Sequence, residues 1–160
     1  MNTKKTNLSD YNPDQVPSGN AYTIGIVVAE WNGDITNALL KGAYDTLISH
    51  GVMPDNIIVK HVPGSYELTT GADWMLRRTK CDAVICLGCV IQGETRHFDF
   101  ICEAVANGLT NVSLKHEKPV IFGLLTPNNM QQALDRAGGK HGNKGVEAAV
   151  TAIKMCALCE

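Results

Sequence analysis

Short apolar runs alternate along the chain with stretches whose apolar residues recur at helical spacing. Residues 22–29 and 82–91 are apolar at both alternating positions, which is typical of strands buried on both faces of a parallel sheet. Residues 57–62 and 120–125 form shorter runs bounded by proline or glycine, which indicates outer strands. The pattern predicts a central four-stranded parallel sheet.

The stretches between the runs predict helices that cover this sheet. Apolar residues recur every three or four positions in four intervals, which are 35–47, 68–76, 98–112 and 143–158. Thr126 and Pro127 are predicted to cap and open a further short helix that runs to Arg136. Strands that alternate with helices predict a three-layer α/β/α sandwich of the flavodoxin-like type.

The chain divides into a polar arm and one domain. Residues 1–20 carry proline and glycine but no periodic apolar face, so we expect a flexible arm that orders only against a partner. Residues 21–160 fit a single domain, since the chain of 160 residues is 44% hydrophobic and 19% charged. A net charge of −2 and short apolar runs argue against nucleic-acid and membrane partners. We expect a soluble, cytoplasmic protein.

The six cysteines include two Cys-x-x-Cys pairs, a spacing that also occurs in zinc and redox sites. Cys86 and Cys89 lie in a predicted strand, where residues three apart point to opposite faces. Cys156 and Cys159 have no second pair in register with them. Buried or inert thiols that pack as small apolar groups are therefore favoured over a metal site.

The strongest candidate chemistry lies at the carboxyl ends of the strands, where ligands of parallel α/β sheets bind. Residues 88–95 have the glycine and threonine spacing of a phosphate-binding loop, but Glu94 stands in the place of the lysine. Nucleotide hydrolysis is thus disfavoured, whereas a helix N-terminus near Thr95 can still hold a small phosphate. A capped helix without a ligand explains the same residues. Arg136 opens a glycine-rich segment that is either an anion-binding site or a solvated loop.

His97 differs from the other histidines because it falls in the first turn of the third predicted helix, beside the candidate phosphate loop. A helix N-terminus favours the neutral imidazole, which can accept and return protons near pH 7. The other four histidines have structural explanations, at helix ends, in an outer strand and in a loop. A structural role for His97 stays open as well.

Two large rings follow the first and second predicted strands. Trp31 and Tyr66 lie at strand ends, where large rings need a ligand or a neighbouring subunit to cover them. With the polar side chains of Ser65 and Glu67 beside them, they suggest a flat heterocycle with a hydroxylated tail. Ordinary interface packing is the alternative.

Four motifs in this order resemble the 6,7-dimethyl-8-ribityllumazine synthase family, and the resemblance runs from about residue 24 to residue 155. They are V-P-G-S-Y-E-L at 62–68, L-G-C-V-I-Q-G-E-T-R-H-F-D at 87–99, P-V-I-F-G-L-L-T at 119–126 and G-N-K-G at 142–145.

The resemblance implies the penultimate step of riboflavin biosynthesis, without a metal or an organic cofactor. In that step 5-amino-6-(D-ribitylamino)uracil condenses with 3,4-dihydroxy-2-butanone 4-phosphate to give 6,7-dimethyl-8-ribityllumazine, phosphate and water. Cys89 stands where many relatives have threonine. The resemblance assigns Trp31, Ser65, Tyr66, Glu67, Cys89, Val90, Ile91, Phe122 and Lys144 to the uracil substrate, Glu94, Thr95 and Arg136 to the butanone phosphate, and proton transfer to His97.

The resemblance also implies a homo-oligomer with shared sites. Members of the family form pentamers, some of which assemble into icosahedral shells, and Phe122 and Arg136 then reach a neighbour's site. We expect the arm to add a strand to a neighbouring sheet, and riboflavin synthase is the protein partner that such a shell could enclose.

Two rival functions remain on the same scaffold. An archaeal-type riboflavin synthase joins two lumazines and needs no phosphate site, so Thr95 and Arg136 argue against it. A catalytically silent flavin-binding or shell-forming protein could lose His97 and Arg136, and both are present.

Overall fold

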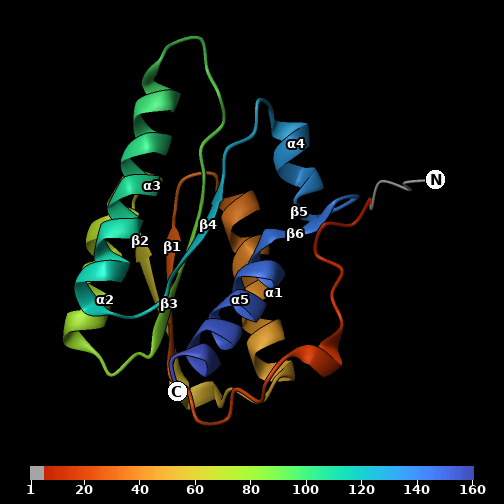
Figure 1. Cartoon of the computed structure of the whole chain (residues 1–160). Coiled ribbons are helices and arrows are strands. Elements are labelled where there is room, and N and C mark those ends of the chain that lie inside the picture. Colours follow the sequence, from red (N-terminus) through yellow and green to blue (C-terminus); the bar gives the residue numbers. More distant parts are fainter. Residues whose placement is uncertain (1–5) are drawn as a thin grey trace.

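Four parallel strands form the central sheet of the computed structural model, which describes residues 6–160 (Figure 1). The strands are β1 (Ile24–Ala29), β2 (Ile57–Val62), β3 (Ala83–Cys89) and β4 (Val120–Leu125). They pair in the order β2-β1-β3-β4, and every residue of the inner strands β1 and β3 is buried. The predicted sheet, with its inner and outer strands, is confirmed.

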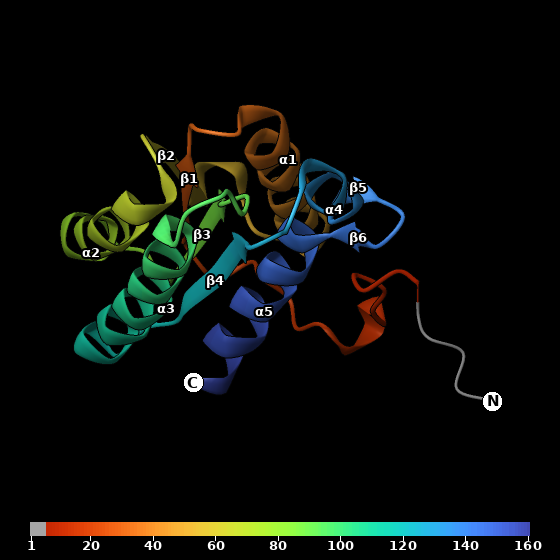
Figure 2. The ribbon, with the colours of Figure 1, turned by 90° about the horizontal axis from the view of Figure 1, so that it is seen from above.

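Two pairs of helices cover the sheet and complete the predicted three-layer sandwich (Figure 2). One face carries α1 (Gly33–Ser49) and α5 (Lys144–Leu158), and the other carries α2 (Leu68–Arg78) and α3 (His97–His116). Residues 6–160 also contain three short 3-10 turns, namely η1 (Pro13–Gln15), η2 (Pro54–Asn56) and η3 (Ser65–Glu67).

Each face of the sheet has its own apolar core. Ile26 of β1 packs in the core under α1 and α5, whereas the next residue, Val27, packs under α2 and α3. Side chains of one strand alternate between the two faces, so a strand buried on both sides must be apolar throughout. This explains why the inner strands read as unbroken apolar runs.

The cysteines of β3 divide between these cores, as their spacing predicted. Cys86 lies in the core under α2 and α3, and Cys89 lies in the opposite core. Burial raises the pKa of the Cys86 thiol to about 12 and that of Cys89 to about 11. Both thiols are therefore protonated near neutral pH and are unsuited to act as nucleophiles.

The segment after β4 differs from its prediction in two places. The short helix α4 (Met130–Asp135) begins later than Thr126 and Pro127, because the side chain of Asn129 caps it by accepting a bond from the Gln132 N–H at 2.9 Å. The following glycine-rich segment is a hairpin and not a solvated loop. Its strands are β5 (Ala137–Gly139) and β6 (Gly142–Asn143), and glycines with positive φ at 138 and 142 permit the tight return.

The described part of the arm, residues 6–20, lies against its own chain. The Gly19 N–H donates to the His50 carbonyl at 2.7 Å, and the Tyr11 hydroxyl lies 2.8 Å from Nε2 of the same histidine. Further along, the Leu8 N–H donates to the His141 carbonyl at 3.0 Å. Residues 1–5 of the predicted arm lie outside the described residues.

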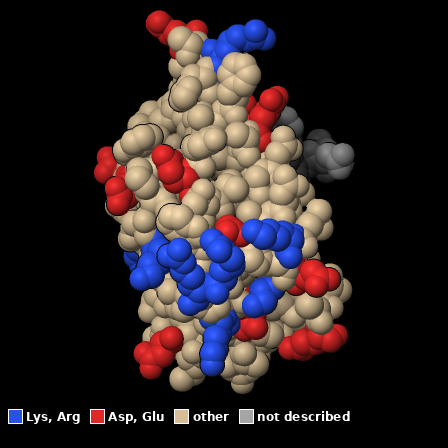
Figure 3. Space-filling model, turned by 90° about the vertical axis from the view of Figure 1, so that its left-hand side faces the viewer, with Lys and Arg blue, Asp and Glu red and all other residues tan. Residues whose placement is uncertain are grey.

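Basic side chains gather over the lower half of the face that α2 and α3 form (Figure 3). On these two helices, Arg77 and Lys115 pair with Asp73, which also lies 2.8 Å from Nε2 of His116. The hydrogen bonds from His116 and Lys115 lower the pKa of the Asp73 carboxyl to about 2. This cluster links α2 to α3 away from the carboxyl ends of the strands. In residues 6–160 no helix is long and apolar enough to cross a bilayer.

Candidate active site

Backbone hydrogen bonds join the loops that follow β1 and β2. The Glu30 N–H donates to the Val62 carbonyl at 2.8 Å, and the Trp31 N–H donates to the Pro63 carbonyl at 3.0 Å. These bonds extend the parallel pairing of the two strands beyond their ends and bring Trp31 next to the turn η3. We call Trp31, Ser65, Tyr66 and Glu67, together with residues 89–91, the aromatic half-site.

Trp31 forms a platform that is supported from one side. A Cβ at Gly64 would lie 2.5 Å from Cε3 of Trp31, so the ring packs directly on the glycine backbone. The ring is nevertheless exposed, since the residue keeps 66% of its accessible surface, and Tyr66 keeps 60%. An aromatic ring fixed from below and open above is suited to stack on a flat heterocycle.

The carboxylate of Glu67 lies beside Trp31 with one oxygen that accepts no hydrogen bond from the described residues. Its Oε2 is buried and has no hydrogen-bond partner among the described residues. A Cβ at Gly64 would lie 3.3 Å from the same oxygen, which places the carboxylate beside the ring of Trp31. A buried polar atom left unpaired costs about 1–3 kcal/mol. A ligand hydroxyl or N–H that reached this oxygen would remove that cost.

Ser65 and Asn32 connect the half-site to the end of β3. A Cβ at Gly88 would lie 2.6 Å from Oγ of Ser65, so the glycine makes room for this buried serine. The Asn32 side chain donates to the Cys89 carbonyl at 2.8 Å from a left-handed backbone with φ 59°. Asn32 was not among the predicted site residues. The Asn-Gly pair three residues after the end of β1 was the available signal, since asparagine tolerates this conformation.

The loop after β3 carries the predicted proton-transfer and phosphate residues. Val90 is fixed by its N–H, which donates to the Leu125 carbonyl at 2.9 Å. Glu94, Thr95 and His97 are exposed, and the Thr95 hydroxyl lies 3.4 Å from the His97 N–H at the start of α3. His97 is the first residue of α3, within the first turn as predicted, and its side chain is accessible to a substrate.

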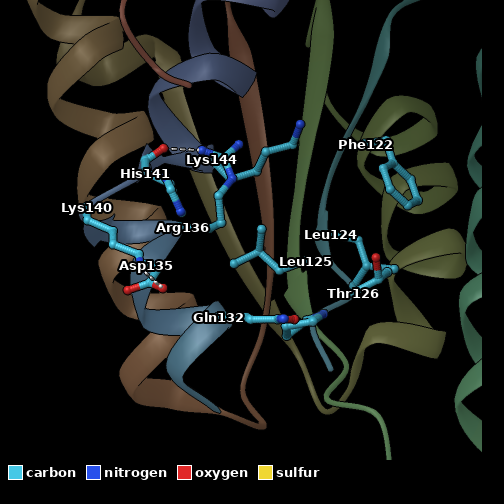
Figure 4. Close-up of a pocket in the computed structure, with 11 residues that line it drawn as sticks. Phe122, Leu124, Leu125, Thr126, Gln132, Asp135, Arg136, Lys140, His141 and Lys144 are labelled. Carbon is cyan, nitrogen blue, oxygen red and sulfur yellow. Dashed lines mark hydrogen bonds and ion pairs between the residues drawn. The ribbon is translucent and has the colours of Figure 1, made fainter. Parts of the chain in front are cut away.

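Phe122, Arg136 and Lys144 line a different pocket of about 650 Å³ beside β4, α4 and the hairpin. Figure 4 shows Arg136 and Lys144 across this pocket from Phe122. We call this group the cationic half-site. None of the residues of the aromatic half-site lines this pocket, so the single chain does not place the two groups in one pocket.

Arg136 is held in place by its own chain. Its Nη1 donates to the His141 carbonyl at 2.6 Å, and its Nη2 pairs with Oε2 of Glu147. Lys144 lies 3.7 Å from the other oxygen of the same carboxylate. Glu147 was not among the predicted site residues either, because nothing in its local sequence distinguishes it from any exposed helical glutamate.

The G-N-K-G motif fixes where Lys144 begins α5. The side chain of Asn143 accepts from the Gly145 N–H at 2.8 Å and donates to the Ala38 carbonyl of α1 at 3.0 Å. A Cβ at Gly145 would lie 1.9 Å from the Leu39 carbonyl oxygen, so only glycine allows this approach of the two helices. The motif is therefore a helix start locked against α1, with the lysine directed to the pocket.

Comparison with known proteins matches this arrangement to one family. The family profile described as 6,7-dimethyl-8-ribityllumazine synthase matches residues 21–160. The 6,7-dimethyl-8-ribityllumazine synthase of Cytophaga hutchinsonii is 58% identical over 157 residues, which cover 98% of both chains. The chain belongs to this family. Lumazine synthases of Porphyromonas gingivalis and Parabacteroides distasonis are 56% and 57% identical, over 99% and 97% of this chain and 98% and 97% of their own.

Membership of the lumazine synthase family confirms the resemblance drawn from the four motifs. Because the matches cover nearly the whole chain, they include both half-sites as well as the described arm. They favour a lumazine synthase over the archaeal-type riboflavin synthase. Within residues 6–160, no group of three histidine, cysteine or acidic side chains is placed to hold a metal ion.

Proposed function

We propose that this lumazine synthase family member condenses 5-amino-6-(D-ribitylamino)uracil with 3,4-dihydroxy-2-butanone 4-phosphate, releasing phosphate and water. The observation that carries the proposal is the buried Oε2 of Glu67, which lies beside the exposed ring of Trp31 and has no hydrogen-bond partner among residues 6–160. A flat pyrimidine with amine and ribityl hydroxyl donors matches both features. The cationic half-site supplies what the second substrate needs, a place for phosphate.

In this proposal the aromatic half-site holds the uracil. Trp31 stacks on the pyrimidine, and Glu67 accepts from a ribityl hydroxyl. Ser65 and Tyr66, with the main chain of residues 89–91, fix the edge of the ring. Phe122 and Lys144 close the pocket from the other half-site.

The cationic half-site binds the phosphate of the butanone. A guanidinium carries about five N–H donors, and two of those of Arg136 are engaged within the described chain, so others can reach an anion. Arg136 thus offers bidentate recognition of the phosphate. Glu94 and Thr95 face the same substrate from the loop after β3.

His97 moves protons between the two substrates. The 5-amino group adds to the ketone, and the adduct loses water to give a Schiff base. Phosphate is then eliminated, which unmasks the second carbonyl. The ribitylamino nitrogen adds to this carbonyl and closes the ring with loss of a second water. Each step needs a proton to be delivered or removed within one pocket, which suits an accessible imidazole. Holding two reactants in register supplies a large part of the rate in such reactions.

A complete site in this proposal needs a second copy of the chain. The two half-sites do not share a pocket within one subunit, and α3 leaves Phe100 and Leu114 largely exposed. We propose a pentamer in which the cationic half-site of one subunit meets the aromatic half-site of the next. Part of the arm adds a strand to a neighbouring sheet, while Leu8 and Ser9 keep their contacts within their own chain. An icosahedral shell of pentamers and enclosed riboflavin synthase extend this proposal. The six free thiols suit a reducing compartment such as the cytoplasm.

The test is a spectroscopic assay of the purified protein with both substrates, following lumazine fluorescence above the uncatalysed rate. We expect protein-dependent product, and less of it with Arg136→Ala at limiting butanone phosphate. A folded and assembled protein that gives no acceleration would contradict the proposal and favour the silent binding or shell-forming role.

A further inference from the structure

Glu147, on the first turn of α5, connects the two cations of the cationic half-site. Its Oε2 pairs with Nη2 of Arg136, and its Oε1 lies 3.7 Å from Nζ of Lys144. Arg136 is only 18% exposed, and Glu147 is 26% exposed, so the pairs are partly shielded from solvent. One carboxylate therefore fixes the separation of two groups that we assign to substrate binding.

The arm holds the same acceptors that hold Arg136. The Leu8 N–H donates at 3.0 Å to the His141 carbonyl, which also accepts from Nη1 of Arg136. The Ser9 hydroxyl lies 2.9 Å from Oε2 of Glu147, the oxygen that pairs with Nη2 of Arg136. Both contacts that fix the guanidinium are thus shared with residues 8 and 9, far away in sequence.

Ser9 is itself held firmly between the hairpin and α5. Its hydroxyl accepts from the Asn143 N–H at 2.7 Å and has one proton to share between the Asn143 carbonyl at 2.8 Å and Glu147. Nearby, Nδ1 of His141 lies 2.6 Å from the Thr6 carbonyl. A Cβ at Gly142 would lie 2.5 Å from Oγ of Ser9, so this glycine makes room for the arm.

The geometry points to Glu147 and arm residues 6–9 as positioning residues that hold Arg136 ready for the phosphate substrate. This inference rests on the proposed function, since it assumes that Arg136 binds phosphate. An arginine side chain loses rotamer entropy when a ligand fixes it, and a side chain already fixed before binding loses less. The carboxylate acts through the arginine and does not itself contact the substrate.

The test compares Glu147→Gln and Ser9→Ala with two matched controls, Asp45→Asn on the exposed side of α1 and Ser18→Ala in the arm. For Glu147→Gln we expect KM for the butanone phosphate to rise about tenfold, the loss of one charge-assisted hydrogen bond. For Ser9→Ala we expect a rise of about two- to threefold, since a neutral bond is lost. We expect kcat and KM for the uracil substrate to stay within about twofold, and both controls to match the wild type.

A double variant separates positioning from direct binding. If Glu147 acts through Arg136, adding Glu147→Gln to Arg136→Ala raises KM no further, because the group that it positions is gone. An independent second loss of about tenfold would overturn the inference. So would an unchanged or lowered KM in Glu147→Gln alone, since a lowered value means that the carboxylate competes with phosphate.

Direct binding of inorganic phosphate, measured by calorimetry, keeps this inference separate from the reaction. Wild-type protein that binds phosphate but makes no lumazine would contradict the proposed function and leave the positioning role standing, provided that Glu147→Gln binds phosphate about tenfold more weakly. Equal phosphate binding by both proteins would overturn the positioning role even in an active enzyme. Thermal unfolding and oligomer mass confirm that each variant is assembled.

Discussion

The two half-sites are built on opposite principles. The aromatic half-site leaves two rings exposed and a buried carboxylate oxygen unpaired among the described residues. In the cationic half-site, Glu147 of the same chain pairs with both Arg136 and Lys144. The aromatic half-site therefore needs its ligand to complete its hydrogen bonds. In the cationic half-site, by contrast, the chain itself fixes the charged side chains. Substitutions on the two sides should therefore fail in different ways.

The largest effect should come from His97, which belongs to neither set of binding contacts. We expect His97→Ala to lower kcat about 100-fold without abolishing turnover, because general acid–base catalysis is lost while positioning is kept. Both KM values should stay within about threefold. Steady-state kinetics on assembled protein measure this, and a variant with no detectable turnover would show that positioning has been overrated.

Arg136→Ala tests the cationic half-site. Removal of a partly buried, bidentate anion partner should raise KM for the butanone phosphate about 30-fold. KM for the uracil substrate should change less than about twofold. An unchanged KM for the butanone phosphate would remove Arg136 from the phosphate site.

Glu67→Gln tests the aromatic half-site and should show the reverse selectivity. We expect KM for the uracil substrate to rise about tenfold, because a charged acceptor becomes a neutral one, with little change for the phosphate substrate. A rise in KM for the butanone phosphate alone would contradict this assignment and place Glu67 at the phosphate substrate.

The carboxylates of Glu67 and Glu147 should differ in their effect on the free energy of unfolding. Glu67→Gln removes the charge of a half-buried carboxylate whose buried Oε2 has no partner among the described residues, so we expect the free energy of unfolding to rise by about 0.5–1 kcal/mol. Glu147→Gln breaks two ion pairs, so we expect it to fall by about 1 kcal/mol. Denaturant unfolding without ligand measures both, and a shift of the same sign in the two variants would contradict the comparison.

Asp73→Asn is the control for ion pairs outside both half-sites, and its effect should be smallest on activity. We expect unchanged kinetics and a loss of about 1 kcal/mol in stability, discounted for partial exposure. Because His116 and Lys115 lower the pKa of Asp73 from 3.8 to about 2, this stabilisation is complete above about pH 4 and is lost as the pH falls through about 2. The free energies of unfolding of wild type and variant, measured as a function of pH, should therefore converge near pH 2. A constant difference across this pH range would mean that the carboxylate is not the source.

The sequence predicts most of the fold because its main signals are local and periodic. The inner strands are apolar on both faces, and the helices repeat every three or four residues, so their positions follow from the pattern. The start of α4 was predicted wrongly because Thr126-Pro127 is itself a good helix-opening pair, whereas the structure uses Asn129. Thr126-Pro127 and Asn129 are both acceptable helix starts and lie within four residues of each other, so the sequence alone did not decide between them.

The missing parts of the site depend on contacts between distant residues. Ser9 and Glu147 are 138 positions apart, and neither has a local pattern that distinguishes it. Asn32 did carry a local signal, but its bond to the Cys89 carbonyl requires the sheet order to be known. Residues that hold a site together were thus harder to predict than those that resemble its known motifs.

The most direct test of two half-sites that meet between copies is complementation. His97→Ala and Arg136→Ala subunits, each with its own tag, are co-expressed, and oligomers that carry both tags are assayed at low butanone phosphate. In a shared site, His97 lies on the subunit that supplies the aromatic half-site and Arg136 on the next subunit. Shared sites predict activity near a quarter of the wild type, because random mixing joins an intact His97 with an intact Arg136 in about one site in four. Activity no greater than the mean of the two parent variants would show that each site lies within one chain and would contradict this account.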